Sequence, residues 1–287
     1  MATPRDSGYF PPGESVLRRV HSERAVGLLY GQRSLLLQAT HPVAFTGLLA
    51  STTGTDAPFQ RLVRTARTME TIFFGTRAEA DRITRGIQRM HSRVRGRTDR
   101  RAGPHPAGTP YSAADPEFLL WILACLADSA LVLHRVFVGE LAPAERERFW
   151  QDYLLLGELF ALPRERAPAD YAAFRAYMRE RLASRDLHVT PEALELGRRV
   201  AFALPLPAHR RPALPAINLA VTGSLPSRVR RLYELPWSAP HEAAYQALVL
   251  SHRVSRPVVP HGLKRGSCAR DYEMVARAER DRLSAAA

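Results

Sequence analysis

The stretch DPEFLLWILACLADSALVLHRVF (115–137) is apolar on nearly every side when it is wound into a helix. Asp115-Pro116 places proline at the first helical position, where its missing N–H costs nothing. A helix that is apolar all round usually lies at the centre of a fold. The segment therefore predicts a protein built around this helix.

Helical spacing of apolar residues continues on both sides of that segment. Residues 14–38 predict one long helix or two, which end at His41-Pro42 because a residue before proline disfavours helical backbone. Asp56 stands as an N-cap before a further apolar series, and Thr76 with Glu79 forms a capping box. The helix after Thr76 is expected to run to Gly96 with one apolar face, formed by Ala80, Ile83, Ile87, Met90 and Val94.

The remaining patterns predict one all-α domain of about ten helices. No alternating strand pattern or internal repeat is visible. Residues 1–13 are interpreted as a loose arm, 14–287 as the single domain and 97–109 as an internal linker. Further helices are expected at 143–160, 168–185, 191–203, 213–222, 225–233, 239–256 and 270–284.

Composition excludes several classes of protein. The chain is 46% hydrophobic and 24% charged, as globular proteins are. Its two cysteines, Cys125 and Cys268, form no cluster that would indicate a zinc finger or an iron–sulfur site. We find no apolar run of the ~18 residues that a membrane span needs and no secretory signal, and we expect a cytoplasmic protein.

The formal net charge of +13 raises nucleic acid as a partner. However, Lys264 is the only lysine among 41 basic residues, and the arginines are spread through every segment. Such a bias indicates codon composition rather than a phosphate-binding face, and no basic stripe interleaved with aromatic residues accompanies it. We therefore expect no specific nucleic-acid partner.

Two of the ten histidines, His41 and His91, stand out by their context, and the other eight have mostly loop or charged surroundings. His91 lies one turn after Ile87 on the apolar face of its helix, so its ring should point inward. A buried imidazole must be hydrogen-bonded or bound to a ligand. From periodicity alone, a core histidine bonded to a carbonyl and a cofactor ligand both remain open.

The order and spacing of several motifs make the chain resemble the mpaB and rubber oxygenase (latex clearing protein) catalytic-domain family over about 14–260. The motifs are QRSLLLQATHPVAFTGLLA (32–50), PFQRLVRTARTMETIFFG (58–75), RMHSRVRG (89–96), the Y-x-A-x-DP-x-x-LLW stretch (111–121) and RRLYELPW (230–237). The resemblance implies an all-α domain with a buried pocket for haem b. It also implies that His91 is the axial ligand of the haem iron, with a basic residue on the opposite side.

Two groups of polar residues could complete such a site. Arg64, Arg67 and Thr68 share one helix face, from which they could direct donors at dioxygen or at haem propionates, or form an ordinary solvated arginine face. Arg93 and Arg95 flank His91 and could pair with propionates. His41 could be a second ligand or a propionate partner, although a turn histidine that caps carbonyls fits its His-Pro corner slightly better.

The sequence departs from the family at three places. The rubber-cleaving members carry a lysine where this chain has Arg67, and arginine is not readily deprotonated to bind iron. Many relatives have a His-Ser pair near 51–52 and a histidine two residues after the tryptophan, whereas this chain has Ser51-Thr52 and Leu123. Haem binding remains compatible with these changes, but they put the distal chemistry of the relatives in doubt.

The leading hypothesis is therefore a haem b-dependent oxygenase or related redox enzyme that acts on a hydrophobic small molecule with dioxygen. The sequence leaves open the substrate and whether an external electron donor is needed. The alternative is a haem- or ligand-binding sensor of the same fold without turnover.

Overall fold

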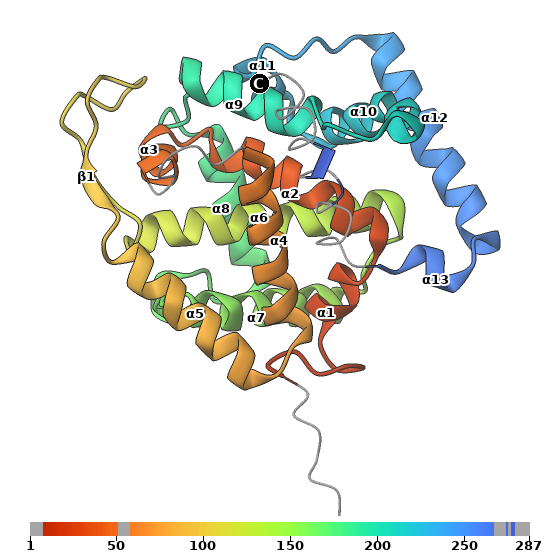
Figure 1. The fold of residues 1–287 in the computed structure, drawn as a ribbon, viewed down its shortest axis with the longest axis horizontal. Coiled ribbons are helices and arrows are strands. Elements are labelled where there is room, and N and C mark those ends of the chain that lie inside the picture. Colours follow the sequence, from red (N-terminus) through yellow and green to blue (C-terminus); the bar gives the residue numbers. More distant parts are fainter. Residues whose placement is uncertain (1–7, 51–57, 267–273, 275–276, 279–287) are drawn as a thin grey trace, which may run out of the picture.

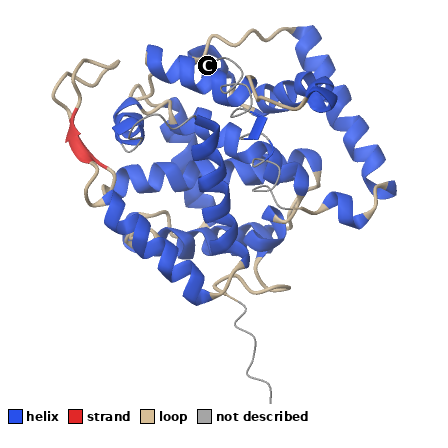
Figure 2. Cartoon of the chain, viewed as in Figure 1, coloured by secondary structure: helices blue, strands red, loops and turns tan. Residues whose placement is uncertain are grey.

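The computed structural model describes residues 8–50, 58–266, 274 and 277–278. Within these residues the fold is a bundle of helices with one small hairpin at its edge (Figures 1 and 2). The helices are α1 Val16–His21, α2 Arg24–Gln38, α3 Pro42–Ala50, α4 Pro58–Phe74, α5 Arg77–His91, α6 Pro116–Phe137, α7 Pro143–Leu159, α8 Tyr171–Ala183, α9 Pro191–Phe202, α10 Leu214–Ser224, α11 Ser227–Leu232, α12 Ala239–Ser255 and α13 His261–Lys264, with short 3-10 turns at Arg164–Arg166, Ala208–Ala213 and Arg256–Val258. The predicted all-α class is confirmed.

Helix α6 is the central helix that its sequence predicts. The Asp115 carboxylate accepts a hydrogen bond from the Glu117 amide, and Pro116 occupies the first turn. The helix packs most extensively against α2 and also contacts α7, α8 and α12. Trp121 on α6 is fully buried, and its indole N–H donates to the Gln38 carbonyl at the end of α2.

The expectation that no segment reaches the apolarity of a membrane span needs a correction. By length and composition, α6 is long and apolar enough to cross a membrane, and it is the one such helix in the described part of the chain. More than half of its most apolar window is buried inside the fold. Its apolarity is thus accounted for by its place in the core.

Of the two alternatives for residues 14–38, two helices form, and Ser22 and Glu23 separate α1 from α2. Other expectations differ from the structure. Residues 42–50 form α3, which the sequence patterns did not indicate. The segment expected to be a loose arm packs against the helices from residue 8 onward. The Phe10 side chain is fully buried, and its ring lies edge-on to the ring of Phe73 on α4. The expected N-cap Asp56 and most of the helix expected at 270–284 lie outside the described residues.

Helix α5 begins as predicted and ends early. The Thr76 side chain accepts from the Glu79 amide, and the Glu79 carboxylate accepts from the Thr76 amide, which completes the capping box. The helix stops at His91 instead of continuing to Gly96. The Met90 side chain, expected on the buried face, is 45% exposed.

The chain after α5 forms an antiparallel hairpin. Strand β1 (Arg95–Arg97) pairs with β2 (Pro110–Ser112), so that Gly96 faces Tyr111. A methyl group at Gly96 would lie 2.7 Å from the Tyr111 hydroxyl, so a larger residue here would require the Tyr111 side chain to shift. The expected linker at 97–109 is the connection between these strands, and the hairpin leads directly into α6 (Figure 1).

A buried ion pair joins the two central helices. The Arg33 guanidinium on α2 lies 2.9 Å from the Asp128 carboxylate on α6, and both side chains are almost completely buried. Arg33 also donates to the Ser224 carbonyl and to the Ser129 hydroxyl, while Arg175 on α8 approaches the second Asp128 oxygen at 2.6 Å. One carboxylate therefore connects three helices.

We expect Asp128→Asn to lower the free energy of unfolding by about 3–5 kcal/mol, because it leaves the buried Arg33 charge without its counter-ion. Urea unfolding monitored by circular dichroism would measure the change. Glu158→Gln, which removes the largely exposed pair with Arg164, is the control and should cost less than about 1 kcal/mol. Equal losses in the two variants would contradict this role of Asp128.

Candidate functional site

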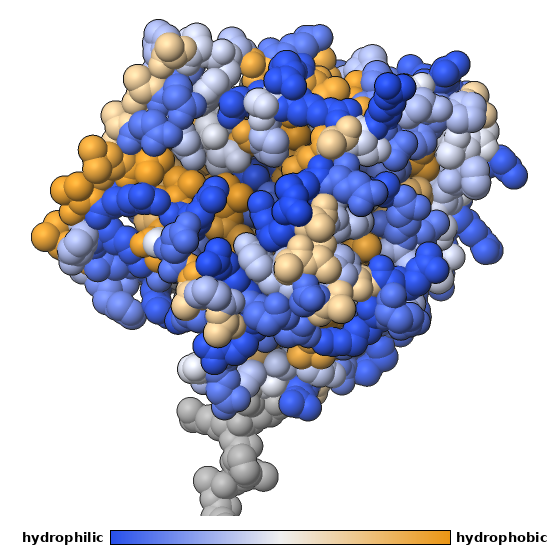
Figure 3. Space-filling model, turned by 180° about the vertical axis from the view of Figure 1, so that it is seen from behind, coloured by the Kyte–Doolittle hydropathy of each residue, from blue (hydrophilic) through white to orange (hydrophobic). Residues whose placement is uncertain are grey.

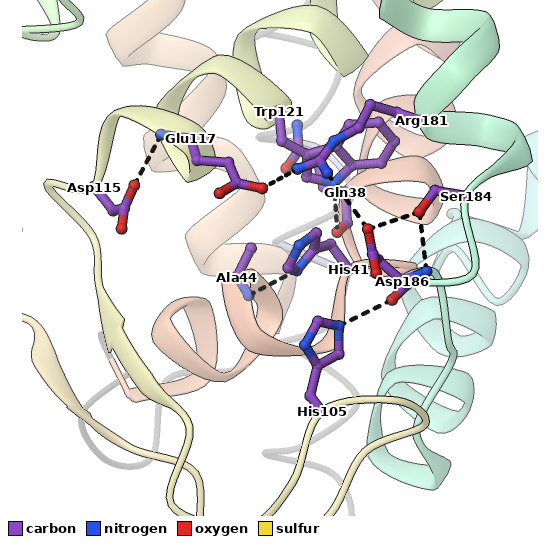
Figure 4. A network of polar contacts seen from close by, with 10 residues as sticks. All are labelled: Gln38, His41, Ala44, His105, Asp115, Glu117, Trp121, Arg181, Ser184 and Asp186. Atoms are coloured by element: carbon purple, nitrogen blue, oxygen red, sulfur yellow. Dashed lines mark hydrogen bonds and ion pairs between the residues drawn. The ribbon is translucent and has the colours of Figure 1, made fainter.

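His41 lies in a buried polar cluster at the corner between α2 and α3 (Figure 4). Its Nδ1 atom accepts a hydrogen bond from the Ala44 amide at 3.4 Å, so the ring caps the N-terminus of α3. The expectation that this histidine caps carbonyls is wrong for this contact, because the partner is an amide donor. The ring also lies 5.3 Å from the ring of His105 and 5.2 Å from that of Phe118.

Charged side chains from α6 and from the end of α8 complete this cluster. Arg181 forms ion pairs with Glu117 and, at 3.6 Å, with Asp186. A hydrogen bond from the Ser184 hydroxyl lowers the pKa of Asp186, and the Asp186 carbonyl lies 3.1 Å from Nε2 of His105. Burial, reinforced by the Arg181 charge, lowers the pKa of His41 to about 4. His41 is thus a neutral imidazole with a structural contact, and its proposed contact with a cofactor stays a prediction.

His91 is the last residue of α5. Its side chain is half-buried, and its Nδ1 atom is fully buried without a hydrogen-bond partner among the described residues. Burial lowers the pKa of this imidazole, which keeps it neutral and able to donate a lone pair. Among the described residues, no carbonyl accepts a hydrogen bond from the His91 ring. The structure therefore does not show the alternative of a core histidine bonded to a carbonyl.

Arg93 and Arg95 follow His91 at the start of the hairpin. Both side chains are exposed, and Arg95 pairs with Ser112 through its backbone. The chain between them is held in place because the Ala113 amide donates to the Val94 carbonyl. Two cations therefore lie within four residues of the unsatisfied imidazole.

Helix α4 packs against α5, and the two meet at Gly75 (Figure 1). From that turn they spread apart toward Pro58 and His91. Arg64 and Arg67 on α4 are exposed and Thr68 is half-buried, while Val63 and Ala66 on the opposite face are buried. The three polar residues do share a face, as their spacing predicts, and either role proposed for them remains compatible with that exposure.

The departures from the family pattern are accounted for in part. Leu123 lies in the apolar core between α6 and α7, where a methyl group added at Gly157 would lie 2.9 Å from it. A leucine here fills space that a histidine could occupy only with a polar partner. Ser51 and Thr52 lie outside the described residues.

Three further residues were missed by sequence reasoning. Gln32, which opens the QRSLLLQATHP stretch, is completely buried, and neither amide atom has a partner among the described residues. His105 contacts His41, and Nε2 of buried His21 lies 2.7 Å from the Tyr153 hydroxyl. Only Gln32 carried a usable signal, because an amide inside an apolar helix stretch needs a partner.

The arrangement around His91 is therefore a neutral imidazole with an unpartnered buried nitrogen at a helix end, followed by two exposed arginines. Arg64, Arg67 and Thr68 lie on the neighbouring helix α4, and no described contact joins them to His91. Residues 18–254 match the family model described as ER-bound oxygenase mpaB/B'/Rubber oxygenase, catalytic domain. The chain belongs to this family. The resemblance inferred from the motifs is thus confirmed, and with it a general oxygenase role.

Two curated relatives have the same similarity to this member of the family. They are Uncharacterized protein Mb2261 of Mycobacterium bovis and Uncharacterized protein Rv2237 of Mycobacterium tuberculosis. Each is 27% identical over 241 residues, which cover 82% of this chain and 90% of the relative. No solved structure matches the chain.

We expect His41→Asn to flatten the pH dependence of stability. Folding lowers the pKa of His41 from 6.5 to about 4, so the unfolded chain binds more protons between these values. The contribution of His41 to the free energy of unfolding is therefore fully present above pH 6.5. It is lost as the pH falls toward 4, by up to about 1.4 kcal/mol per pH unit. Asparagine keeps an N-cap acceptor without the titration.

Urea unfolding at pH 7, 6 and 5 would measure the slope for His41→Asn. His209→Asn, at an exposed position, is the control for the histidine-to-asparagine exchange itself. A His41→Asn variant with the parent slope would show that His41 titrates normally in the folded protein.

Proposed function

We propose that this protein is a haem b-dependent oxygenase, or a related redox enzyme, that acts on a hydrophobic small molecule with dioxygen. The observation that carries the proposal is the buried Nδ1 atom of His91, which has no partner among the described residues in a member of an oxygenase family. A neutral imidazole with an unpartnered nitrogen has a lone pair that is available to bind a metal. Haem needs only one such side chain from the protein.

His91 would bind the iron as a neutral imidazole, which the lowered pKa favours at neutral pH. Arg93 and Arg95 would pair with the propionates through charge-assisted hydrogen bonds. Their exposed positions suit carboxylates at the rim of a site. When bound, haem would supply the activation of dioxygen, which protein side chains cannot provide.

The α4 face would act on the other side. Arg67 is permanently charged, and with Arg64 and Thr68 it could hold donors toward negative charge that develops at oxygen during turnover. Because arginine is not readily deprotonated, the guanidinium would orient and stabilise rather than occupy a position on iron. A cytoplasmic location and an apolar substrate pocket are further parts of the proposal.

The decisive experiment for the cofactor is the absorption spectrum of the protein purified from haem-supplemented cells. A Soret band with stoichiometric haem is expected. His91→Ala should abolish stoichiometric haem binding and keep the helical circular dichroism spectrum, whereas His209→Ala, which changes an exposed histidine, should bind haem normally. A wild-type spectrum and stoichiometry in His91→Ala would refute the ligand assignment.

Arg67→Ala tests the role of α4. We expect near-normal haem content and dioxygen consumption with an alkene substrate slowed about 100-fold, the usual effect of losing one preorganised donor. Arg82→Ala, on an exposed position of α5, is the matched control. Loss of haem affinity would instead make Arg67 a propionate partner, and no change in either quantity would remove it from the site.

Haem binding without turnover in the parent protein would identify a haem-binding protein that lacks oxygenase activity.

A further inference from the structure

Apolar side chains gather on the surface of the C-terminal helices. Of six large hydrophobic side chains that are exposed among the described residues, four lie within the short segment from α12 to α13. We name them the apolar ridge: Leu250, Val254, Val258 and Leu263, exposed by 63%, 69%, 84% and 61%. Figure 3 shows apolar surface at this edge of the molecule, on the left of that view and on the right of Figure 1.

The ridge residues lie on three consecutive short elements at one edge of the molecule. Leu250 and Val254 lie one turn apart on α12, Val258 ends the 3-10 turn that follows, and Leu263 lies on α13. The opposite face of α12 is occupied, because Tyr245 and Val249 are buried against the rest of the fold. The α12 part of the ridge is therefore the outward face of a helix that already uses its inner face for packing.

The segment that carries the ridge is basic, and one of its four cations is paired with an acidic side chain. The segment LSHRVSRPVVPHGLKRG (250–266) contains Arg253, Arg256, Lys264 and Arg265 and no acidic residue. Arg256 pairs with Glu23 at 3.0 Å. Arg253 donates to the carbonyls of Arg135 and Val136 and Arg265 to the Ser22 hydroxyl, so these contacts hold the side chains without neutralising them.

Exposed apolar residues flanked by basic residues without acidic partners are typical of a helix that lies in the interface of an anionic membrane. Self-association through this face is disfavoured, because two copies would bring like charges together.

We propose that the apolar ridge binds the surface of an anionic lipid bilayer, with Leu250, Val254, Val258 and Leu263 in the acyl boundary and the adjacent basic residues at the lipid headgroups. The ridge lies on a different part of the molecule from α5 and the hairpin (Figure 1). The proposal does not depend on haem or on turnover.

Sedimentation of the full-length protein with vesicles tests the proposal. The vesicles are made of phosphatidylcholine alone or of equal parts phosphatidylcholine and phosphatidylserine. We expect binding to the mixed vesicles that weakens with salt, and much weaker binding to phosphatidylcholine alone. Absence of binding to the mixed vesicles at low salt would overturn the proposal.

Two pairs of variants separate the apolar and charged contributions. Val254→Ser with Val258→Ser should weaken binding to mixed vesicles at least tenfold, whereas Met90→Ser, another exposed apolar residue, should leave it unchanged. Lys264→Gln with Arg265→Gln should weaken it about 25-fold, since each basic residue near an anionic surface contributes about fivefold. Arg82→Gln with Arg85→Gln removes the same charge from α5 and should have a much smaller effect.

Binding through net charge and self-association of the chain each give a result that differs from binding through the ridge. Equal losses from the two charge pairs would show that net charge alone drives binding and would refute the assignment of the ridge. A monomer–dimer equilibrium that Val254→Ser with Val258→Ser abolishes, without vesicle binding by the parent protein, would make the ridge an interface between copies of this chain. Circular dichroism of each variant shows whether it is folded, and these solvent-exposed changes are expected to leave the fold intact.

Discussion

The fold depends on the carboxylate of Asp128, the one acidic side chain in the central helix beyond its first turn. Burying a charge in an apolar helix is costly unless hydrogen bonds and an opposite charge compensate it. Asp128 is compensated twice, by Arg33 from α2 and by Arg175 from α8. Arg33 in turn bonds to the Ser224 carbonyl of α10. Because these contacts are directional, they determine how the four helices are arranged more sharply than apolar packing alone does.

That arrangement determines where the candidate site can form. The hairpin leads directly into α6, and the Ala113 amide attaches its end to the chain just after His91. The position of His91 is therefore tied at one side to the capping box of α5 and at the other to the central helix. These contacts fix the backbone around His91, whereas the Nδ1 atom of its ring has no hydrogen-bond partner among the described residues.

Features that depend on residues within one helical turn were predicted correctly from the sequence. Contacts between distant segments were not predicted. Thr76 with Glu79 and Asp115 with Pro116 act within one turn, so their roles were predicted correctly. The periodic pattern continues past the actual helix end at His91, where the hairpin forms instead, and Met90 in the last turn of the helix is exposed. Strands of three residues, Arg-Gly-Arg in β1 and Pro-Tyr-Ser in β2, are too short to leave an alternating pattern. His105 and His21 were dismissed because their partners, His41 and Tyr153, lie far away in the chain, whereas His91 was found through a motif within its own helix.

The chemistry expected at position 67 depends on the properties of arginine. It does not depend on whether function or composition accounts for the arginine there. A chain with one lysine among 41 basic residues would carry arginine at most basic positions regardless of function. The exchange of lysine for arginine is therefore no sign of a specialised role by itself. Its physical effect is nevertheless definite, because lysine can lose its proton and bind a metal, whereas arginine keeps its charge and offers several donors in a plane. If the proposed haem site is correct, Arg67 would therefore act there by donating hydrogen bonds and would not be a ligand of the iron.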